Sequence, residues 1–192
     1  MKRPPANPFS AFCRKAFDFL EGSRTRHLVI GGLAVGAIGE ARTTGDVDVV
    51  GFASPEDAEA LIAKAVEAGF DVRPELEQER LQETGTLRFR HGAFQLDIIL
   101  ASLPFEEVAY ARAVRKRLFG RMVALPTPED LILFKVLAGR DKDILDAIGV
   151  ARRHLPGLDR RYLEDTIRGL CDLAEDMQPW QRLEDVLRKA AL

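Results

Sequence analysis

The sequence predicts an α/β fold, with a small mixed β-sheet and flanking helices over residues 1–125 and a helical region over residues 126–192. Short apolar runs rich in β-branched residues alternate with helical patterns in the first region. Segment 86–100 has the pattern of a hairpin, whereas every pattern after Pro126 has helical spacing. With 192 residues the chain is long enough to bury a sizeable core, and we expect two domains that meet near residue 125.

Composition excludes several classes of protein. The chain is 46% hydrophobic and 30% charged, which is typical of a folded protein rather than a disordered one. Its formal net charge of −2 gives no overall attraction to nucleic acid or to an acidic membrane. The N-terminus lacks the apolar run of a signal peptide, and no apolar stretch reaches the roughly 18 residues of a membrane span. We therefore expect a cytoplasmic protein without a membrane segment.

The first region is predicted to alternate helices and strands. A helical pattern of apolar residues covers Phe9 to Leu20, and the next helix begins directly after the pair Gly31-Gly32. Ser54 and Pro55 mark another helix start, as N-cap and first-turn residue. The strands predicted between these helices are HLVIGG at 27–32 and DVDVVGF at 46–52.

The hairpin pattern TLRFRHGAFQLDIIL, residues 86–100, also predicts a register. A two-residue turn at His91-Gly92 would place Thr86 opposite Asp97 and would make one face of the pair wholly apolar. This register puts Asp97 on the polar face of an otherwise apolar strand. The polar face would carry Thr86, Arg88, Gln95 and Asp97.

Beyond the hairpin, segment 104–118 is predicted to be a helix with a basic last turn, and 120–125 an edge strand. Residues 127–155 are predicted to form two helices, with Gly139 as C-cap of the first and Asp141 as N-cap of the second. The basic run is more typical of a solvated helix face than of a docking site for RNA or an acidic partner. It comprises Arg112, Arg115, Lys116, Arg117 and Arg121.

Two carboxylates interrupt the second predicted strand, at Asp46 and Asp48. Side chains two apart on a strand share a face, at a backbone spacing of about 7 Å. Carboxylates about 5 Å apart repel by roughly 3 kcal/mol at an effective dielectric near 20, and Asp97 would add to the repulsion if it shares the face. Two explanations are open for carboxylates placed side by side: they lie on a solvent-exposed edge of the sheet, or a divalent cation neutralises their charge. Mg²⁺ prefers carboxylates together with substrate phosphates.

The glycines that precede Asp46 favour the second explanation, in which a divalent cation neutralises the two carboxylates. Gly31-Gly32 follow one strand and open a helix, where backbone N–H groups can approach an anion closely. Other phosphate-binding loops fit poorly, because residues 31–39, GGLAVGAIG, contain no GxGxxG pattern and Gly36 is not followed by Lys-Ser/Thr. No serine lies in a GxSxG motif either.

The stretch GGLAVGAIGEARTTGDVDVV, residues 31–50, resembles the signature of the polymerase-beta-like nucleotidyltransferase superfamily. That signature is a strand, Gly-Gly or Gly-Ser, a helix, then Asp-x-Asp on the next strand. Thirteen residues separate Gly32 from Asp46, at the long end of what the family uses, and Asp97 matches its third carboxylate. The form RTTGDVD and the later PEDLILFKVLAGRDKDILD, residues 128–146, are similar to the AbiEii-type toxin nucleotidyltransferases.

The resemblance implies a nucleotidyltransferase core and a role for each matching residue. Asp46 and Asp48 would hold Mg²⁺, or Mn²⁺ in its place, on the phosphates of an NTP. Asp97 would complete a second metal site and help to deprotonate the acceptor hydroxyl. The predicted nucleotide-binding residues are Gly31, Gly32, Arg42, Thr44, Lys135, Asp143 and Asp146.

Structural roles are the alternative for some of these residues. Arg42 and Thr44 could brace the turn before the strand, and Lys135 could be a lysine that snorkels at the edge of an apolar helix. In one unbroken helix Lys135 and Asp146 would stand about 16 Å apart. They can converge on one substrate only if the chain bends at Gly139.

The implied activity is transfer of an NMP from an NTP to a hydroxyl. Likeness to AbiEii-type proteins implies a tRNA end or another RNA as the acceptor, and a toxin paired with an antitoxin protein. A small antibiotic or a protein side chain would fit the same active site. The rival from another class is a nucleotide-binding or interaction module that keeps the fold and has lost turnover.

Overall fold

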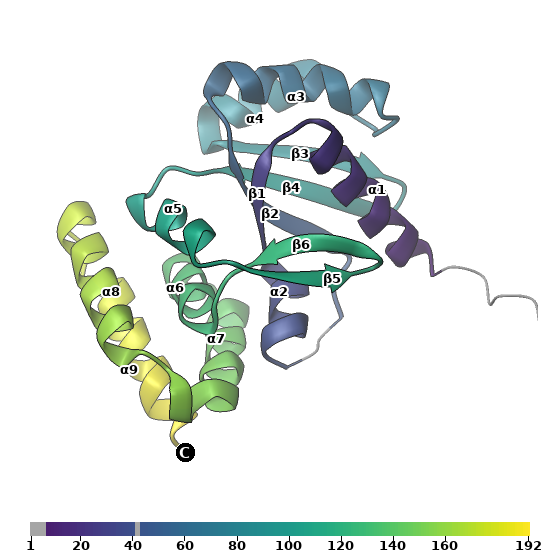
Figure 1. The fold of residues 1–192 in the computed structure, drawn as a ribbon. Coiled ribbons are helices and arrows are strands. Elements are labelled where there is room, and N and C mark those ends of the chain that lie inside the picture. The colour runs from purple at the N-terminus through teal and green to yellow at the C-terminus, as the bar shows by residue number, and fades with distance from the viewer. Residues whose placement is uncertain (1–6, 41–42) are drawn as a thin grey trace, which may run out of the picture. The chain divides into compact units, whose positions relative to one another are not determined.

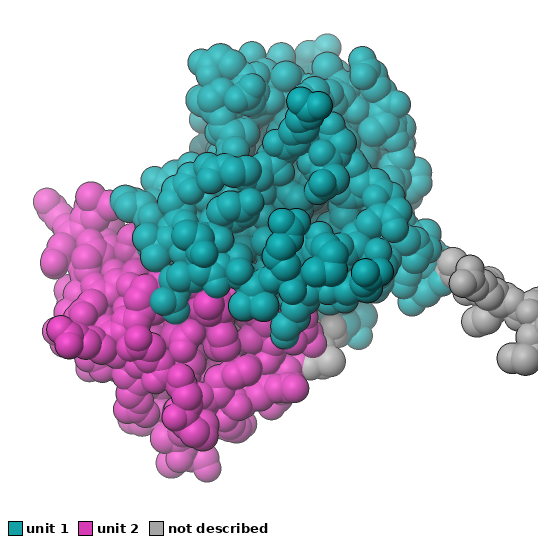
Figure 2. All heavy atoms as spheres, viewed as in Figure 1, with its two compact units in different colours: residues 1–32, 43–125 teal, residues 33–42, 126–192 magenta. Residues whose placement is uncertain are grey.

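The computed structural model describes residues 7–40 and 43–192, and the chain divides into two compact units (Figure 1). Figure 2 colours unit 1, residues 1–32 and 43–125, in teal and unit 2, residues 33–42 and 126–192, in magenta. Among the helices of the described residues, none has the length and apolar character needed to cross a membrane.

Unit 1 contains a four-stranded sheet, a two-stranded β-ribbon and the helices around them (Figure 1). The strands are β1 (Arg26–Ile30), β2 (Asp46–Phe52), β3 (Thr86–His91), β4 (Phe94–Leu100), β5 (Val114–Leu118) and β6 (Arg121–Leu125). The helices are α1 (Pro8–Gly22), α3 (Pro55–Glu67), α4 (Pro74–Thr84) and α5 (Pro104–Ala111). Helix α2 (Gly31–Ile38) starts in unit 1 with its two glycines and continues in unit 2. The predicted α/β class with a small mixed sheet is confirmed.

The sheet has the strand order β1-β2-β4-β3. Strands β2 and β4 run parallel, while both outer strands run antiparallel to their neighbours. Asp48 is the register partner of Asp97 across β2 and β4, and of Ile30 across β1 and β2. Because partners in register lie on the same side of a sheet, and residues two apart do as well, Asp46, Asp48 and Asp97 share one face.

The opposite face of the sheet is apolar and forms the core of unit 1. Helix α1 packs there through aromatic rings: Phe12 lies 5.6 Å from Phe94 between ring centroids, and Phe19 lies 5.7 Å from Phe89. Alternation of apolar and polar residues along β2 and β4 thus explains both faces at once.

The hairpin of β3 and β4 differs from its predicted register. Its turn is Gly92-Ala93, because His91 pairs with Phe94, and Thr86 lies opposite Ile99. The predicted register is therefore wrong by two positions, a shift that keeps every side chain on its predicted face. Its consequence is that Arg88, not Thr86, lies opposite Asp97.

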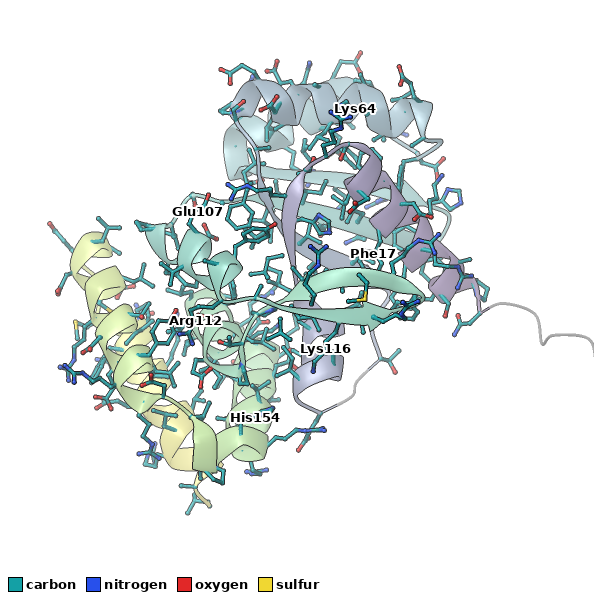
Figure 3. All side chains as sticks on the ribbon, in the orientation of Figure 1. Phe17, Lys64, Glu107, Arg112, Lys116 and His154 are labelled. Atoms are coloured by element: carbon teal, nitrogen blue, oxygen red, sulfur yellow. The ribbon has the colours of Figure 1, made fainter. Side chains whose placement is uncertain are left out.

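The basic run does not lie on a helix: Arg112 follows α5, Arg115, Lys116 and Arg117 lie on one strand, and Arg121 begins the next. Helix α5 ends at Ala111, and residues 114–118 form β5, which pairs with β6 as a separate antiparallel ribbon. The predicted helix over 104–118 is thus wrong in its second half. Figure 3 labels Lys116 on β5, and four of the five residues of that strand are exposed. A solvated surface for this run is consistent with that exposure.

Unit 2 is helical apart from a single 3₁₀ turn. It comprises the later part of α2 with α6 (Pro128–Ala138), α7 (Asp141–His154), the turn η1 (Leu155–Gly157), α8 (Arg160–Ala174) and α9 (Gln178–Ala190). Gly139 ends α6 in a left-handed conformation, φ +66°, as predicted for a C-cap. Arg140 occupies the N-cap position of α7 and Asp141 is its first residue, so the predicted cap is displaced by one position.

The end of α2 is held within unit 2 by the C-terminal part of α7. The imidazole Nε2 of His154, labelled in Figure 3, lies 2.8 Å from the carbonyl oxygen of Ile38. Arg153 donates a hydrogen bond of 2.8 Å to the carbonyl of Gly39. These two bonds satisfy carbonyl groups that a helix leaves unpaired at its C-terminus.

Candidate active site

The candidate site begins at the bend between β1 and α2. Gly31 has φ +63°, and a Cβ atom there would lie 2.6 Å from the carboxyl carbon of Asp48. A Cβ at Gly32 would lie 2.8 Å from the side chain of Thr44. Only glycine fits at these two positions, because the backbone of the bend lies directly against side chains at the start of β2.

Thr44 braces the approach to β2. Its hydroxyl lies 3.3 Å from both the amide nitrogen and the carbonyl oxygen of Asp46, in the pattern of a turn closed by a threonine side chain. Thr44 therefore has a structural contact at this point, next to Gly32. Arg42, the other residue predicted near this turn, lies outside the described residues.

Asp46 and Asp48 are both partly exposed on the polar face of the sheet. Strand β2 is otherwise almost wholly buried, whereas Asp46 and Asp48 both retain contact with solvent. Such a placement allows a ligand to reach them without unfolding the strand.

The carboxylate of Asp97 is bound by Arg88, whereas the predicted register had placed Thr86 opposite Asp97. The Nε and one terminal nitrogen of Arg88 each donate a hydrogen bond of 2.8 Å, one to each carboxylate oxygen of Asp97. The hydrogen bonds to Asp97 raise the pKa of the Arg88 guanidinium above its ordinary value, and the carboxylates of Asp97, Asp46 and Glu77 add to this against the effect of burial. The Gln95 amide donates a further bond of 3.3 Å to Asp97.

This pairing limits which metal site the side chains fit. Among the described residues, no group of three His, Cys, Asp or Glu side chains is arranged to hold a metal ion. Arg88 binds both oxygens of Asp97, the third carboxylate of the predicted metal set. Asp46 and Asp48 are carboxylates of the kind that Mg²⁺ commonly takes, one or two at a time, with substrate phosphates completing its shell.

In unit 2, Lys135 makes two buried ion pairs. Its ammonium lies 2.8 Å from an oxygen of Asp143 and 3.2 Å from an oxygen of Asp146. All three side chains are buried, and Asp143 is wholly inaccessible. The reversal of the chain at Gly139 brings α7 back alongside α6, so residues that one straight helix would separate are in contact.

Burial alone would raise the pKa of Asp143, but hydrogen bonds from Arg140 and Lys135 outweigh it and the pKa lies below its ordinary value. Asp143 therefore remains charged in the folded chain. Lys135 does not snorkel into solvent. It is the centre of a buried charged cluster.

The structure thus brings the predicted site residues together in two sets. Unit 1 places Gly31, Gly32, Thr44, Asp46, Asp48 and Asp97 around the glycine bend and the polar face of the sheet. Unit 2 joins Lys135, Asp143 and Asp146 by ion pairs. Arg88 was missed, although its signal was present: a hairpin turn placed at Gly92-Ala93 puts it opposite Asp97.

Solved nucleotidyltransferases have a similar fold. The antibiotic-resistance factor ANT(2'')-Ia, solved in solution, matches 86% of this chain and 94% of its own with a TM-score of 0.59 and 16% identity. An antigenic nucleotidyltransferase-like protein from Paracoccidioides brasiliensis matches with a TM-score of 0.51 and 18% identity, over 96% of this chain and 94% of its own. The lincosamide antibiotic adenylyltransferase LnuA, lincomycin-bound, matches with a TM-score of 0.50 and 14% identity, over 77% and 98%.

These likenesses define the class of fold: the chain has the fold of nucleotidyltransferases of known structure. No family model matches the sequence, and no curated protein matches it. With identities of 14% to 18%, the similarity is one of fold.

Proposed function

We propose that this protein is a cytoplasmic, metal-dependent nucleotidyltransferase of the polymerase-beta-like superfamily that transfers an NMP from an NTP to a hydroxyl group. The observation that carries the proposal is the contact between the glycine bend and Asp48. A bend that can expose backbone N–H groups to phosphates lies against a carboxylate that can hold the metal of a nucleotide.

In the proposed reaction, backbone N–H groups at Gly31 and Gly32 bind the phosphates, and Asp46 and Asp48 hold the Mg²⁺ that accompanies them. When bound, Mg²⁺, or Mn²⁺ in its place, neutralises charge on the triphosphate. Both metal-binding residues lie on one rigid strand of the sheet. Catalysis then consists mainly of positioning and charge neutralisation.

Asp97 is proposed to accept the proton of the acceptor hydroxyl. Each carboxylate oxygen has two lone pairs, so Asp97 can accept this proton's hydrogen bond while Arg88 orients it. The hydroxyl oxygen bonds to the α-phosphorus as its proton moves to Asp97, and pyrophosphate leaves with the electrons of the broken P–O bond. Arg88 is a positioning residue in this scheme.

The roles of Lys135, Asp143 and Asp146 in nucleotide binding are part of the same proposal. Lys135 has three N–H donors, of which two are directed at Asp143 and Asp146. A triphosphate contact from the third donor is consistent with this arrangement. The buried carboxylates would fix the ammonium for it.

A hydroxyl of RNA, such as a tRNA end, is the proposed acceptor, with a toxin role and an antitoxin partner as in the AbiEii-type proteins that the sequence resembles. The alternatives are a small antibiotic and a protein side chain. A second structure of ANT(2'')-Ia contains adenylyl-2''-tobramycin, and LnuA was solved with lincomycin. An assay of acceptors should therefore include both kinds of molecule.

The test is NMP transfer by the wild-type chain and by Asp48→Asn. Each of the four α-labelled NTPs is offered with Mg²⁺ or Mn²⁺ to bulk tRNA, to the protein itself, to tobramycin and to lincomycin. We expect a labelled product with at least one acceptor, lost in Asp48→Asn and kept in the control Asp172→Asn, which removes an exposed carboxylate of α8. No labelled product under any condition would support the inactive nucleotide-binding module instead.

A further inference from the structure

A second feature of unit 1 is a pocket of about 590 Å³ between α4 and β3. Four arginines and two carboxylates contribute to its lining, which leaves a formal charge of +2. These charged residues are Asp71, Arg73, Glu77, Arg80, Arg88 and Arg90. A cavity of this size lined by guanidinium groups is suited to an anion.

The pocket has a fixed frame. Glu77 of α4 is buried and accepts a hydrogen bond of 2.7 Å from the backbone N–H of Arg88. The backbone N–H of Asp71 donates 2.7 Å to the carbonyl of Arg90, in an isolated bridge at the outer edge of β3. A side-chain carboxylate of α4 thus binds a main-chain N–H of β3, and residue 71 is attached to β3 by a main-chain hydrogen bond.

Two of the four arginines have partners and two do not. Arg88 binds Asp97, and Arg80 lies 3.4 Å from the carboxylate of Glu77. Within residues 7–40 and 43–192, the side chains of Arg73 and Arg90 form no ion pair or hydrogen bond. Both are exposed, so their positive charge is available to a ligand in the pocket.

The position of the pocket relates it to the candidate active site. The strand order places the glycine bend at one edge of the sheet, Asp46 and Asp48 next, then Asp97, and β3 at the other edge. Arg88 and Arg90 are two apart on β3 and share the face of Asp97. With strands about 4.8 Å apart, the pocket lies roughly 10 Å across the sheet from Asp48, on the side away from the glycine bend.

We propose that this pocket binds a phosphate group of the acceptor molecule. The inference rests on the proposed nucleotidyl transfer, because it assigns the acceptor to the side of Asp97 that faces away from the nucleotide phosphates. Arg73 and Arg90 supply unpaired guanidinium groups, whose planar N–H pairs match phosphate oxygens. A multiply cationic acceptor such as tobramycin would meet like charge here. An acceptor with phosphate groups would meet opposite charge.

Binding of inorganic phosphate, measured by calorimetry in the presence of EDTA, tests the pocket separately from catalysis. We expect the double variant Arg73→Gln/Arg90→Gln to bind phosphate at least about tenfold more weakly than wild type. The control Arg160→Gln removes an exposed arginine of α8 and should leave the affinity unchanged. Circular dichroism and thermal melting verify that the variants are folded. Equal affinity in the double variant and the wild type would overturn the proposal.

Competition experiments distinguish the source of the phosphate. Displacement of inorganic phosphate by a short single-stranded RNA identifies a phosphodiester acceptor, and displacement only by glycerol phosphate identifies a small phosphomonoester. Either result supports the pocket. With the acceptor so identified, the double variant should have a higher KM for the acceptor and an unchanged KM for the NTP. An equal rise in both values would overturn the assignment of the pocket to the acceptor.

Nucleotidyl transfer and phosphate binding in the pocket depend on different residues, so a failure of one proposal is distinguishable from a failure of the other. Asp48→Asn should lose NMP transfer and keep phosphate affinity in EDTA, because the pocket does not include β2. Transfer that persists in Asp48→Asn would contradict the proposed enzyme alone. Phosphate affinity that persists in Arg73→Gln/Arg90→Gln would contradict the pocket alone.

Discussion

Arg88 and Asp97 form the most consequential side-chain pair of unit 1. Their two parallel hydrogen bonds fix the carboxylate in one orientation, and the side chains are 31% and 11% exposed, so solvent screens the pair only in part. A carboxylate held in this way keeps its direction between substrate-binding events. This is a useful property in a group proposed to receive a proton.

Replacing Arg88 by Gln should destabilise the chain. The largely buried Asp97 would lose a charged partner, which costs about 1–3 kcal/mol in free energy of unfolding. Chemical denaturation of Arg88→Gln, Asp97→Asn and the double variant measures this loss and the coupling between the residues. Losses that simply add in the double variant would show that the pair contributes no interaction energy.

For individual side chains of the hairpin, the sequence predicted correctly which residues lie on the polar face, but it predicted the wrong cross-strand partners. Alternation with period two specifies which face a side chain occupies, and a shift of two positions leaves that pattern unchanged. The choice between turns at His91-Gly92 and Gly92-Ala93 depends on backbone geometry: Gly92 has φ +61°, a conformation glycine favours. The partner of Asp97 followed from that choice.

Among the helices and strands, the junction of β1 and α2 is closely constrained by the contacts of Gly31 and Gly32. Gly31 has a positive φ and lies against Asp48, so the junction requires glycine at this position. Gly36 in the same helix is exposed, and a Cβ there would meet open space. The two glycines thus have opposite requirements within a single helix.

Alanine substitutions at these positions should have opposite effects. Gly31→Ala should lower the free energy of unfolding by about 2–4 kcal/mol, since it combines a left-handed backbone with a steric overlap. Gly36→Ala should raise it by about 0.5–1 kcal/mol, because alanine favours a helix interior. Denaturant unfolding of Gly31→Ala and Gly36→Ala, each compared with wild type, measures both changes in the free energy of unfolding. A Gly31→Ala chain as stable as wild type would contradict the close contact with Asp48.

Other elements show where local patterns lose their predictive power. Helix α4 was not predicted: its only buried residue is Glu77, so it has almost no apolar stripe, and it contacts α3 and β3. Strand β5 has the sequence VRKRL, which gives no apolar alternation, and its structure depends on pairing with β6. In both cases the element is stabilised by contacts with neighbouring elements, which its own residue pattern does not encode.

For the molecule as a whole, the ion pairs of Lys135 connect α6 and α7 inside a helical unit. Removing one partner from a buried pair leaves an uncompensated charge, so such clusters make the native state sensitive to protonation. Asp143 is the most buried member of the cluster, and its pKa lies below its ordinary value because Arg140 and Lys135 donate hydrogen bonds to it.

Stability should therefore fall in acid, in part through Asp143. A lowered pKa in the folded state contributes stability that is fully present above the unfolded pKa of about 3.9 and is lost as the pH falls through the folded value. Denaturation measured at several pH values from neutral to acid should show this loss in wild type. Asp143→Asn should be less stable at neutral pH and should lose less stability on acidification, whereas Asp172→Asn should follow wild type. Parallel curves for wild type and Asp143→Asn would contradict the prediction.

No local pattern in the sequence predicted that residues 33–42 belong to the same compact unit as residues 126–192. Residues 33–40 follow a strand of unit 1, yet a Cβ at Gly39 would lie 2.7 Å from the side chain of Val150, so the chain there packs closely on α7. Contacts between positions more than 100 apart follow from packing alone, and no pattern of period two or 3.6 encodes them. The bend at Gly139, in contrast, was predictable because a left-handed helix cap has its own residue preference.

That early segment has a consequence for biosynthesis. Leu33, Val35 and Ile38 are buried in the finished protein, but their unit is completed only when residues 126–192 emerge from the ribosome. About 150 further residues, 41–192, must be translated first, which at about 5–20 residues per second takes roughly 8–30 s. During that delay the nascent chain exposes an apolar helix, and a chaperone that shields it would raise the yield of folded protein.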